Sequence, residues 1–205
     1  MTFSLPKLYP ITDTRLTGLS HAGQVEQLAA GGATLIQLRE KMASPREFYE
    51  ASLAAMKVAR ALGVRIIIND RVDIAVAVAA DGVHLGQDDL PPDRARNLLG
   101  PRALIGFSTH NLKQALEADS MAVDYIAFGP VFATSTKENP DPVVGLDLLA
   151  EIKSRVSKPL VAIGGITLER AVSVIEAGAD SLAVISDLYS TGDTSKRVAA
   201  FFRRI

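Results

Sequence analysis

Two acidic clusters at the ends of neighbouring apolar runs are the residues best suited to chemistry. Asn69 and Asp70 directly follow the β-branched run 64–68, and Asp88 and Asp89 lie just after the apolar run 81–85. A short helical segment at 74–80 separates the runs, and this order predicts parallel strands whose carboxyl ends meet at one edge of a sheet. Asp70 and Asp89 are therefore expected to face each other across one cavity.

Two such carboxylates about 4 Å apart repel by about 4 kcal/mol at an effective dielectric constant of about 20, so the pair normally holds a cation or shares a proton. The neighbours Asn69, Gln87 and Asp88 add only oxygen and amide groups, which favour Mg²⁺ over Zn²⁺. The same residues also allow a simpler interpretation, in which Asp70 caps a helix and Asp88 and Asp89 lie in a solvated turn.

Composition limits the classes of protein that these residues can serve. The length of 205 residues suits one domain, 1–205, with a sizeable core. The net charge is −1 and no basic block is present, so nucleic acid is not an expected partner and a few placed cations must hold any anionic ligand. The chain has no cysteine, which excludes disulfides, thiolate metal sites and thiol nucleophiles. Its apolar runs are too short for a membrane span and no signal peptide is recognised, so a reducing, cytoplasmic setting is expected.

Apolar runs of strand length alternate with segments of helical periodicity along the whole chain. The predicted strands are 8–12, 33–38, 64–68, 81–85, 103–107, 123–128, 159–163 and 180–185. The predicted helices are 21–30, a capped helix from residue 45, 74–80, 92–99, 111–119, 146–155, 167–177 and 193–204. Eight such pairs without a linker predict a single α/β domain, a closed (β/α)8 TIM barrel, with a doubly wound open sheet as the alternative. A barrel places its active groups just after the strands, at the carboxyl-terminal end, which we call the mouth.

The residues after the second predicted strand carry two cations. If the alternation of the strand persists, Gln37, Arg39 and Lys41 share one face and aim an amide and two positive charges at one place. The planar fork of arginine and the point charge of lysine together suit a diphosphate. The alternative is a solvated rim on which Arg39 pairs with Glu40.

Two further loops offer groups for phosphate. The long loop 129–144 contains the run TSTK at 134–137, whose hydroxyls and lysine can hold phosphate oxygens while the loop closes over a substrate. After the seventh and eighth strands come Gly165 and the pair Ile185 and Ser186, positions at which such barrels often bind phosphate through backbone N–H groups. The alternatives are a plain exposed loop and a tight glycine turn.

The histidines give no clear catalytic arrangement. Ser108 and His110 follow the fifth predicted strand, but a lone histidine beside a helix start is more often a capping group than a catalytic one. His21 and His84 lack a second histidine at metal-ligand spacing. Together these groups would form a site with one divalent metal ion, a separate phosphate site made by backbone N–H groups, and three cationic side chains, Arg39, Lys41 and Lys137. Such a site indicates two phosphorylated small-molecule substrates, one of them a diphosphate.

Seven motifs, in order along the chain, resemble the thiamine-phosphate synthase family. They are YPITD at 9–13, QLREK at 37–41, IIND at 67–70, ADGVHLGQDD at 80–89, GFSTH at 106–110, TSTK at 134–137 and AIGGI at 162–166. The resemblance implies a TIM-barrel transferase that joins 4-amino-2-methyl-5-hydroxymethylpyrimidine diphosphate to 4-methyl-5-(2-phosphoethyl)thiazole, or its carboxylated form, and releases pyrophosphate. It allows a homo-oligomer without indicating one.

The resemblance also implies roles for individual residues. Asp70 and Asp89 would ligate one Mg²⁺ per subunit, and the catalytic groups would be Arg39, Lys41, Ser108 and Lys137. The diphosphate would be held by Arg39, Lys41, Asn69 and Lys137, and the pyrimidine would lie near Gln37 and Ser108. The full implied substrate-binding set is Gln37, Leu38, Arg39, Glu40, Lys41, Asn69, Ser108, Thr134, Ser135, Thr136, Lys137, Gly165, Ile185 and Ser186.

The implied reaction needs leaving-group stabilisation and positioning more than an acid–base pair. The electron-rich aminopyrimidine expels pyrophosphate, and the thiazole nitrogen captures the resulting methylene cation. A competing interpretation within the same superfamily is a thiazole tautomerase, an isomerase in which His110 acts as acid and base. A third is a barrel that binds a phosphorylated ligand without turnover.

Overall fold

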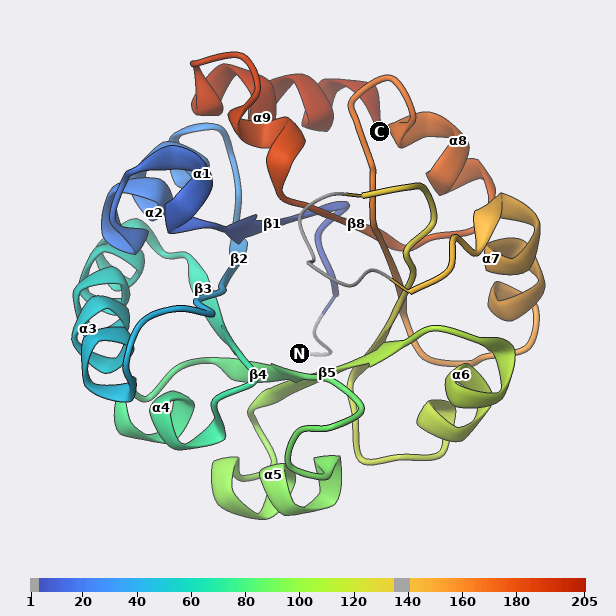
Figure 1. Ribbon diagram of the computed structural model, residues 1–205, viewed down its shortest axis with the longest axis horizontal. Coiled ribbons are helices and arrows are strands. Elements are labelled where there is room, and N and C mark those ends of the chain that lie inside the picture. The colour runs from blue at the N-terminus through green and yellow to red at the C-terminus, as the bar shows by residue number, and fades with distance from the viewer. Residues whose placement is uncertain (1–3, 135–140) are drawn as a thin grey trace.

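The computed structural model describes residues 4–134 and 141–205. Within them, parallel strands pair each with the next, and the first pairs with the last, to close a barrel (Figure 1). The strands are β1 (Leu8–Thr12), β2 (Leu35–Leu38), β3 (Arg65–Asn69), β4 (Gly82–Leu85), β5 (Leu104–Thr109), β6 (Tyr125–Phe128), β7 (Leu160–Ile163) and β8 (Ser181–Val184). The prediction of a closed (β/α)8 barrel is confirmed, and the open-sheet alternative is wrong.

Helices surround the barrel as an outer ring (Figure 1). They are α1 (Thr14–Thr17), α2 (His21–Ala30), α3 (Pro45–Leu62), α4 (Val72–Ala77), α5 (Pro92–Leu99), α6 (Leu112–Asp119), α7 (Gly145–Lys153), α8 (Ala171–Glu176), the 3₁₀ helix η1 (Ser186–Tyr189) and α9 (Thr194–Arg204). The short helices α1 and η1 were not predicted, and α8 begins four residues after the predicted position 167. No helix in the described part of the chain combines the length and apolarity that a membrane crossing requires.

The helix α3 shows how local sequence sets an element. The Ser44 hydroxyl accepts the Glu47 backbone N–H at 3.3 Å, and the Glu47 carboxylate accepts the Ser44 N–H at 2.8 Å, which completes a capping box. Pro45 occupies the first turn, where a missing N–H costs nothing. The helix ends at Gly63, whose φ of 68° is the left-handed conformation that glycine adopts without strain.

Strand alternation divides the core into two layers. Leu35 belongs to the cluster inside the barrel, whereas Ile36 and Leu38 belong to the larger cluster between strands and helices. The interior also contains the Tyr125 ring, which lies over Gly106 of the adjacent strand β5 because Gly106 lacks a side chain. A Cβ at Gly106 would lie 2.0 Å from Tyr125 Cζ. The interior is therefore packed with side chains, and the site must lie above it at the mouth.

Candidate active site

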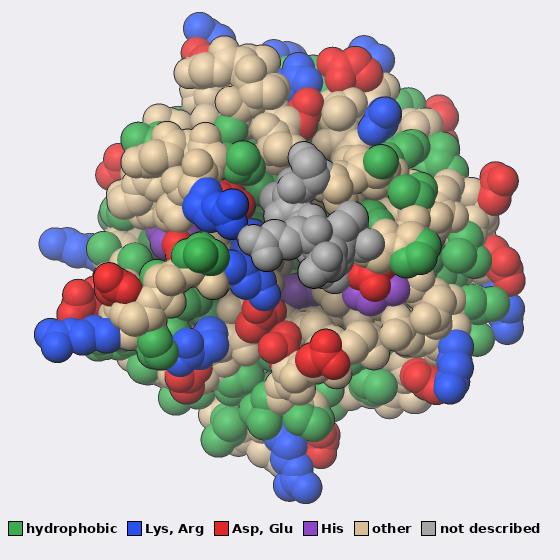
Figure 2. Space-filling view, in the orientation of Figure 1, with side chains coloured by type: hydrophobic (Ala, Val, Ile, Leu, Met, Phe, Trp, Pro, Cys, Tyr) green, Lys and Arg blue, Asp and Glu red, His purple; other side chains and the backbone are tan. Residues whose placement is uncertain are grey.

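Charged side chains of both signs gather at the mouth. Figure 2 shows basic and acidic groups side by side near the centre of the face. Asp70 comes directly after β3, and its backbone N–H donates to the His84 carbonyl of β4 at 2.8 Å. Its φ of 61° is the left-handed conformation, which is uncommon for a residue other than glycine. The tight exit from β3 places its carboxylate against Lys41 Nζ, with which it forms an ion pair.

Asp89, from the loop after β4, lies beside Asp70. Burial raises the pKa of Asp89; the Gly86 N–H, 2.7 Å from its Oδ2, opposes this shift, and the charge of Asp70 and a hydrogen bond with it reinforce it. The two acidic clusters therefore approach one another, and their role as metal ligands stays a prediction. The loops after β2, β3 and β4 together present one ammonium and two carboxylates.

This donor set fits Mg²⁺. Two carboxylates close enough to raise the pKa of one of them are stabilised by a shared cation, and both offer the oxygen ligands that Mg²⁺ prefers. Among the residues that the structure describes, no cluster of three or more histidine, cysteine or acidic side chains could hold a metal. Mg²⁺ usually keeps several waters and binds substrate phosphates, so two carboxylates can form part of its site.

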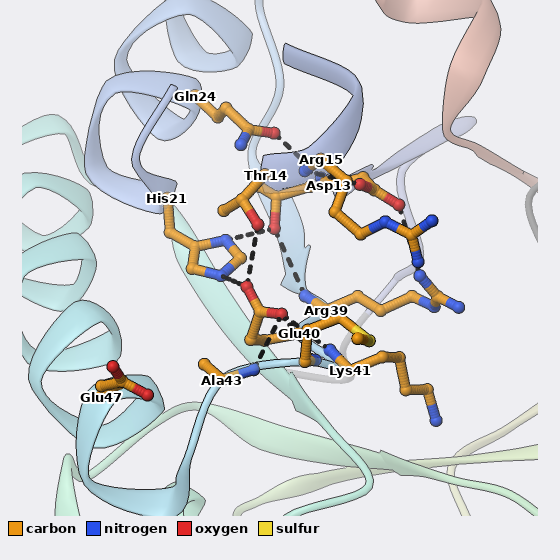
Figure 3. A network of polar contacts seen from close by, with 12 residues as sticks. Asp13, Thr14, Arg15, His21, Gln24, Arg39, Glu40, Lys41, Ala43 and Glu47 are labelled. Carbon is orange, nitrogen blue, oxygen red and sulfur yellow. Dashed lines mark hydrogen bonds and ion pairs between the residues drawn. The ribbon is translucent and has the colours of Figure 1, made fainter. Parts of the chain in front are cut away.

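The residues after β2 divide between two directions. Arg39 and Lys41 face the mouth, and Gln37 on the same side points into the barrel just below it, as alternation predicted. Arg39 Nη1 lies 3.4 Å from Asp13 Oδ2. The Leu38 side chain is fully buried in the layer toward the helices, so the structure does not bring it to the mouth. Glu40 does not form the rim pair with Arg39, because its carboxylate is turned toward Thr14 and its own loop (Figure 3).

A chain of hydrogen bonds crosses the barrel below the mouth and joins Gln37 to Ser108. Gln37 Nε2 donates to the Tyr9 hydroxyl at 3.1 Å, and the Tyr9 and Tyr125 hydroxyls lie 3.0 Å apart. The Tyr125 hydroxyl lies 3.0 Å from His84 Nδ1, and His84 Nε2 lies 2.9 Å from Ser108 Oγ. The two residues expected near the pyrimidine are therefore the ends of one connected network.

The protonation state of His84 helps to determine which groups donate and which accept in this hydrogen-bond chain. Burial lowers the pKa of His84 to about 4, although the nearby Asp70 charge opposes the shift, so the ring is neutral and has one N–H. The Tyr9 hydroxyl accepts from Gln37, and its own proton finds an acceptor in this chain only at the Tyr125 hydroxyl. Tyr125 then donates to Nδ1, so the ring N–H lies on Nε2 and donates to Ser108. Ser108 keeps its own proton for another acceptor.

Tyr9, His84 and Tyr125 were not predicted as members of the site. Two signals in the sequence could have indicated them. Tyr9 occupies an alternate position of its strand, the kind that faces the barrel interior, and the isolated Gly106 leaves room for the Tyr125 ring. Asn69, which was predicted, is buried at the end of β3 and lies beside His84 in the strand register.

The loops after β6 and β7 pack closely at the predicted phosphate position. Gly165 has a φ of +61°, and a Cβ there would lie 2.4 Å from the Ala133 carbonyl oxygen and 2.8 Å from Phe132 Cβ. The Phe132 N–H donates to the Gly164 carbonyl at 3.0 Å. Thr134 follows this contact, whereas Ser135, Thr136 and Lys137 lie outside the described residues.

The loop after β8 is tied to the loop after β7 by a hydrogen bond and to α9 by an ion pair. Ile185 and Ser186 lead into η1, and Asp187 in that helix accepts the Leu168 N–H at 3.2 Å. Arg197 from α9 donates to both Asp187 oxygens at 2.9 Å. The two loops expected to bind a phosphate through their backbones are therefore held together.

His110 is held at the edge of the mouth. Its Nδ1 lies 2.7 Å from the Gly129 carbonyl oxygen and 3.6 Å from Asp141 Oδ2. Because a carbonyl can only accept, the ring proton lies on Nδ1. The backbone N–H of His110 donates to Gln114 at 2.8 Å, a contact typical of a helix start.

Comparison with known proteins identifies relatives over nearly the whole chain. Residues 8–188 match the family described as thiamine monophosphate synthase. The thiamine-phosphate synthase of Koribacter versatilis is 49% identical over 97% of this chain and 95% of its own length. The thiamine-phosphate synthase of Chloroflexus aurantiacus is 47% identical over 92% of this chain and 88% of its own length.

Solved structures agree with these sequence relatives. Thiamine phosphate pyrophosphorylase from Pyrococcus furiosus superposes with a TM-score of 0.86 at 39% identity, covering 96% of this chain and 94% of that one. A Bacteroides thetaiotaomicron protein of the same description, at 17% identity and a TM-score of 0.71, supports the fold alone. The length of the family match and the identity of these relatives lead to one conclusion: the chain belongs to the thiamine monophosphate synthase family.

Proposed function

We propose that this protein is a thiamine-phosphate synthase, which couples 4-amino-2-methyl-5-hydroxymethylpyrimidine diphosphate to 4-methyl-5-(2-phosphoethyl)thiazole and releases pyrophosphate. With the carboxylated form of the thiazole, CO2 is released as well. The observation that carries the proposal is the meeting of Lys41, Asp70 and Asp89 at the mouth of a barrel of this family. An ammonium beside two carboxylates suits a diphosphate that arrives with a divalent cation.

The diphosphate is assigned to one side of the mouth. Arg39, Lys41 and Asn69 bind its oxygens, and Lys137 from the loop after β6 joins them. Asp70 and Asp89 hold Mg²⁺, which when bound neutralises part of the diphosphate charge as a Lewis acid. The ion pairs that Arg39 and Lys41 already form with Asp13 and Asp70 keep both cations at the mouth before substrate binds.

The thiazole phosphate is assigned to the other side. The backbone N–H groups around Gly165, Ile185 and Ser186 bind its oxygens, as loops in these positions commonly do in such barrels. The hydroxyls of Thr134, Ser135 and Thr136 contact this phosphate or the leaving group. The close packing of Gly165 against Phe132 and the Asp187–Arg197 ion pair support a preformed cradle.

The reaction breaks the bond between the pyrimidine methylene carbon and the diphosphate oxygen, and the electron pair leaves with pyrophosphate. Arg39, Lys41 and Lys137 stabilise the departing charge. Gln37 and Ser108, at the two ends of the cross-barrel chain, orient the pyrimidine. The thiazole nitrogen then donates its lone pair to the methylene cation to form the C–N bond, and no protein group has to transfer a proton in either step.

The test is to incubate the protein with both phosphorylated substrates, with and without Mg²⁺, and to measure thiamine phosphate and pyrophosphate together. We expect equal amounts of both products, formed only with Mg²⁺. Lys137→Ala is expected to slow turnover, and turnover near that of the wild type would remove Lys137 from its role. If neither product forms with folded protein, the proposal is wrong. The next assay is then isomerisation of the carboxylated thiazole phosphate, measured for the wild type and for His110→Ala.

A further inference from the structure

The carboxylate of Glu40 is enclosed although both of its neighbours in the chain are cations of the mouth. Its side chain is only 11% exposed. Oε1 accepts three successive backbone N–H groups of the same loop, and Oε2 accepts one hydroxyl and faces one imidazole nitrogen. These partners are Lys41 N at 2.9 Å, Met42 N at 2.9 Å, Ala43 N at 3.4 Å, Thr14 Oγ1 at 2.8 Å and His21 Nε2 at 3.6 Å. The loop after β2 is thus wrapped around one carboxylate.

The partners of Glu40 outside its loop come from the segment that follows β1. Thr14 is the first residue of α1, and His21 is the first residue of α2. His21 is 1% exposed, and its Nε2 has no hydrogen-bond partner in the described part of the chain. The Glu40 carboxylate faces this nitrogen as an ion-pair partner. Glu40 therefore connects the loop after β2 to two neighbouring helices (Figure 3).

The contacts of His21 with Thr12 and Glu40 indicate which imidazole nitrogen carries the proton. The Thr12 hydroxyl accepts the Arg39 N–H at 3.3 Å and has a single proton of its own, which can go to His21 Nδ1 at 2.8 Å or to the Gln37 carbonyl at 3.3 Å. The position of Glu40 decides between them: a carboxylate 3.6 Å from Nε2 favours an imidazole proton on Nε2, so Nδ1 accepts the Thr12 proton. An ionised Glu40 is an acceptor only, which matches the donors around it.

The charges of the two groups agree with this assignment. Burial lowers the pKa of His21, although Glu40 and Asp13 oppose the shift. Burial would raise the pKa of Glu40, but its hydrogen bonds from Met42, Thr14 and Ala43 lower the pKa below its ordinary value. The pair is therefore a neutral imidazole beside a carboxylate.

We propose that Glu40 is a positioning residue, which fixes the backbone between Arg39 and Lys41 so that both cations point at the diphosphate; this inference rests on the proposed function. Figure 3 shows the side chains of Arg39 and Lys41 extending to the opposite side from that of Glu40. Because the Glu40 carboxylate is occupied by its own loop, it does not neutralise either cation.

The test uses magnesium pyrophosphate as the probe, with its dissociation constant measured by calorimetry. Glu40→Gln keeps the shape of the side chain but puts an amide donor where the carboxylate accepts. We expect it to weaken magnesium pyrophosphate binding, and to raise the KM for the pyrimidine diphosphate, by about tenfold, the factor of about one lost charge-assisted hydrogen bond. The KM for the thiazole phosphate should stay within about twofold.

Thr14 provides a second pair of variants in case Glu40→Gln does not fold. Thr14→Val removes the hydroxyl that donates to Glu40 at 2.8 Å, and Thr14→Ser keeps it. We expect Thr14→Val to weaken magnesium pyrophosphate binding severalfold and Thr14→Ser to restore the wild-type value. Equal binding by both variants would overturn the role of Glu40.

Glu47→Gln is the matched control, because the same chemical change then falls on the exposed carboxylate that caps α3. We expect wild-type binding of magnesium pyrophosphate from it. If Glu40→Gln and Glu47→Gln weaken binding equally, or if Glu40→Gln raises both KM values by the same factor, Glu40 only stabilises the fold and the inference is wrong. A wild-type protein that makes no thiamine phosphate rejects the proposed function itself, whatever the variants do.

Discussion

Asp89 and the adjacent Asp88 have the same side chain in different surroundings. Asp89 is half-buried and in contact with Asp70, whereas Asp88 is exposed. Exposure alone would not distinguish a ligand from a turn residue, but the contact with Asp70 does, because the charge of Asp70 and a hydrogen bond with it add to the burial that raises the pKa of Asp89. Single substitutions of Asp89 and Asp88 therefore test the proposed metal site most directly.

Asp89→Asn should lower kcat/KM for the pyrimidine diphosphate by about 100-fold, because one of the two anionic ligands of Mg²⁺ is lost. The measurement is initial rate against Mg²⁺ concentration, and the variant should need more Mg²⁺ to reach half of its maximal rate. Asp88→Asn is the matched control and should stay within about twofold of the wild type. Equal effects of the two changes would contradict the assignment of Asp89.

His21 gives a prediction about stability and pH. Burial holds the pKa of His21 in the folded protein below the ordinary value of 6.5. As the pH falls below 6.5, the unfolded chain binds a proton that the folded protein does not, so the free energy of unfolding decreases. This cost grows down to the folded-state pKa and is absent well above pH 6.5.

The His21→Asn variant should therefore lose less stability than the wild type between pH 6.5 and pH 5. Urea unfolding across this range measures the effect. From pH 7.5 to pH 8.5 both proteins have a neutral side chain at position 21, so the difference between their stabilities should be constant there. The same pH dependence in both proteins below pH 6.5 would show that the pKa of His21 is not lowered by folding.

At the scale of elements, the loops after β7 and β8 depend on backbone that only glycine adopts without strain. Gly165 and Gly192 both have positive φ, of +61° and +76°. A Cβ at Gly165 meets Phe132 and Ala133, whereas a Cβ at Gly192 meets nothing within 4 Å. Comparing alanine substitutions at Gly165 and Gly192 therefore separates the cost of backbone strain from the cost of steric crowding.

Gly192→Ala should cost about 1 kcal/mol of stability, the strain of a left-handed alanine. Gly165→Ala should cost about 1–3 kcal/mol more, because Phe132 and the Ala133 carbonyl must shift. The KM for the thiazole phosphate should rise only in Gly165→Ala, since that loop is assigned to the phosphate. Thermal unfolding and steady-state kinetics check both effects, and a similar KM in the two variants would argue against a phosphate site at Gly165.

The elements themselves were largely predictable because each leaves a local signature. The capping box at Ser44 and Glu47 and the β-branched run of β3 required no knowledge of the rest of the chain. The helices α1 and η1 have four residues each, too few for helical periodicity to be visible. Thr167 resembles a helix start, but its carbonyl accepts the Arg170 N–H at 3.1 Å in a separate turn, and α8 begins after it.

At the scale of the whole molecule, closing the barrel brings together residues that no local pattern relates. Tyr9 and Tyr125 are 116 positions apart, and their hydrogen bond depends on the register of all the strands between them. The alternation of side chains along a strand predicted that Gln37, Arg39 and Lys41 share one side, because this prediction depends on one strand only. The partners of Glu40 could not be predicted, since they depend on how α1 and α2 pack against the loop after β2.

Ligand binding at the mouth should stabilise the whole barrel. Magnesium pyrophosphate at about 100 times its dissociation constant should add about 2.7 kcal/mol to the free energy of unfolding, which corresponds to about 5–10 °C in Tm for a protein of this size. Thermal unfolding with and without the ligand measures this shift. Asp70→Asn should abolish most of it, and Asp88→Asn should retain it. An equal shift in both variants would place the pyrophosphate elsewhere.

The order of the strands places most groups of each proposed substrate in one half of the chain, although Lys137 of the second half is assigned to the diphosphate. Arg39, Lys41 and the carboxylates Asp70 and Asp89 follow β2, β3 and β4, whereas Gly165 and Ser186 follow β7 and β8. The new C–N bond would therefore form at the seam between two half-barrels. The hydrogen-bond chain from Gln37 to Ser108 runs across that seam, so the halves must assemble in register before either substrate finds its reaction partner.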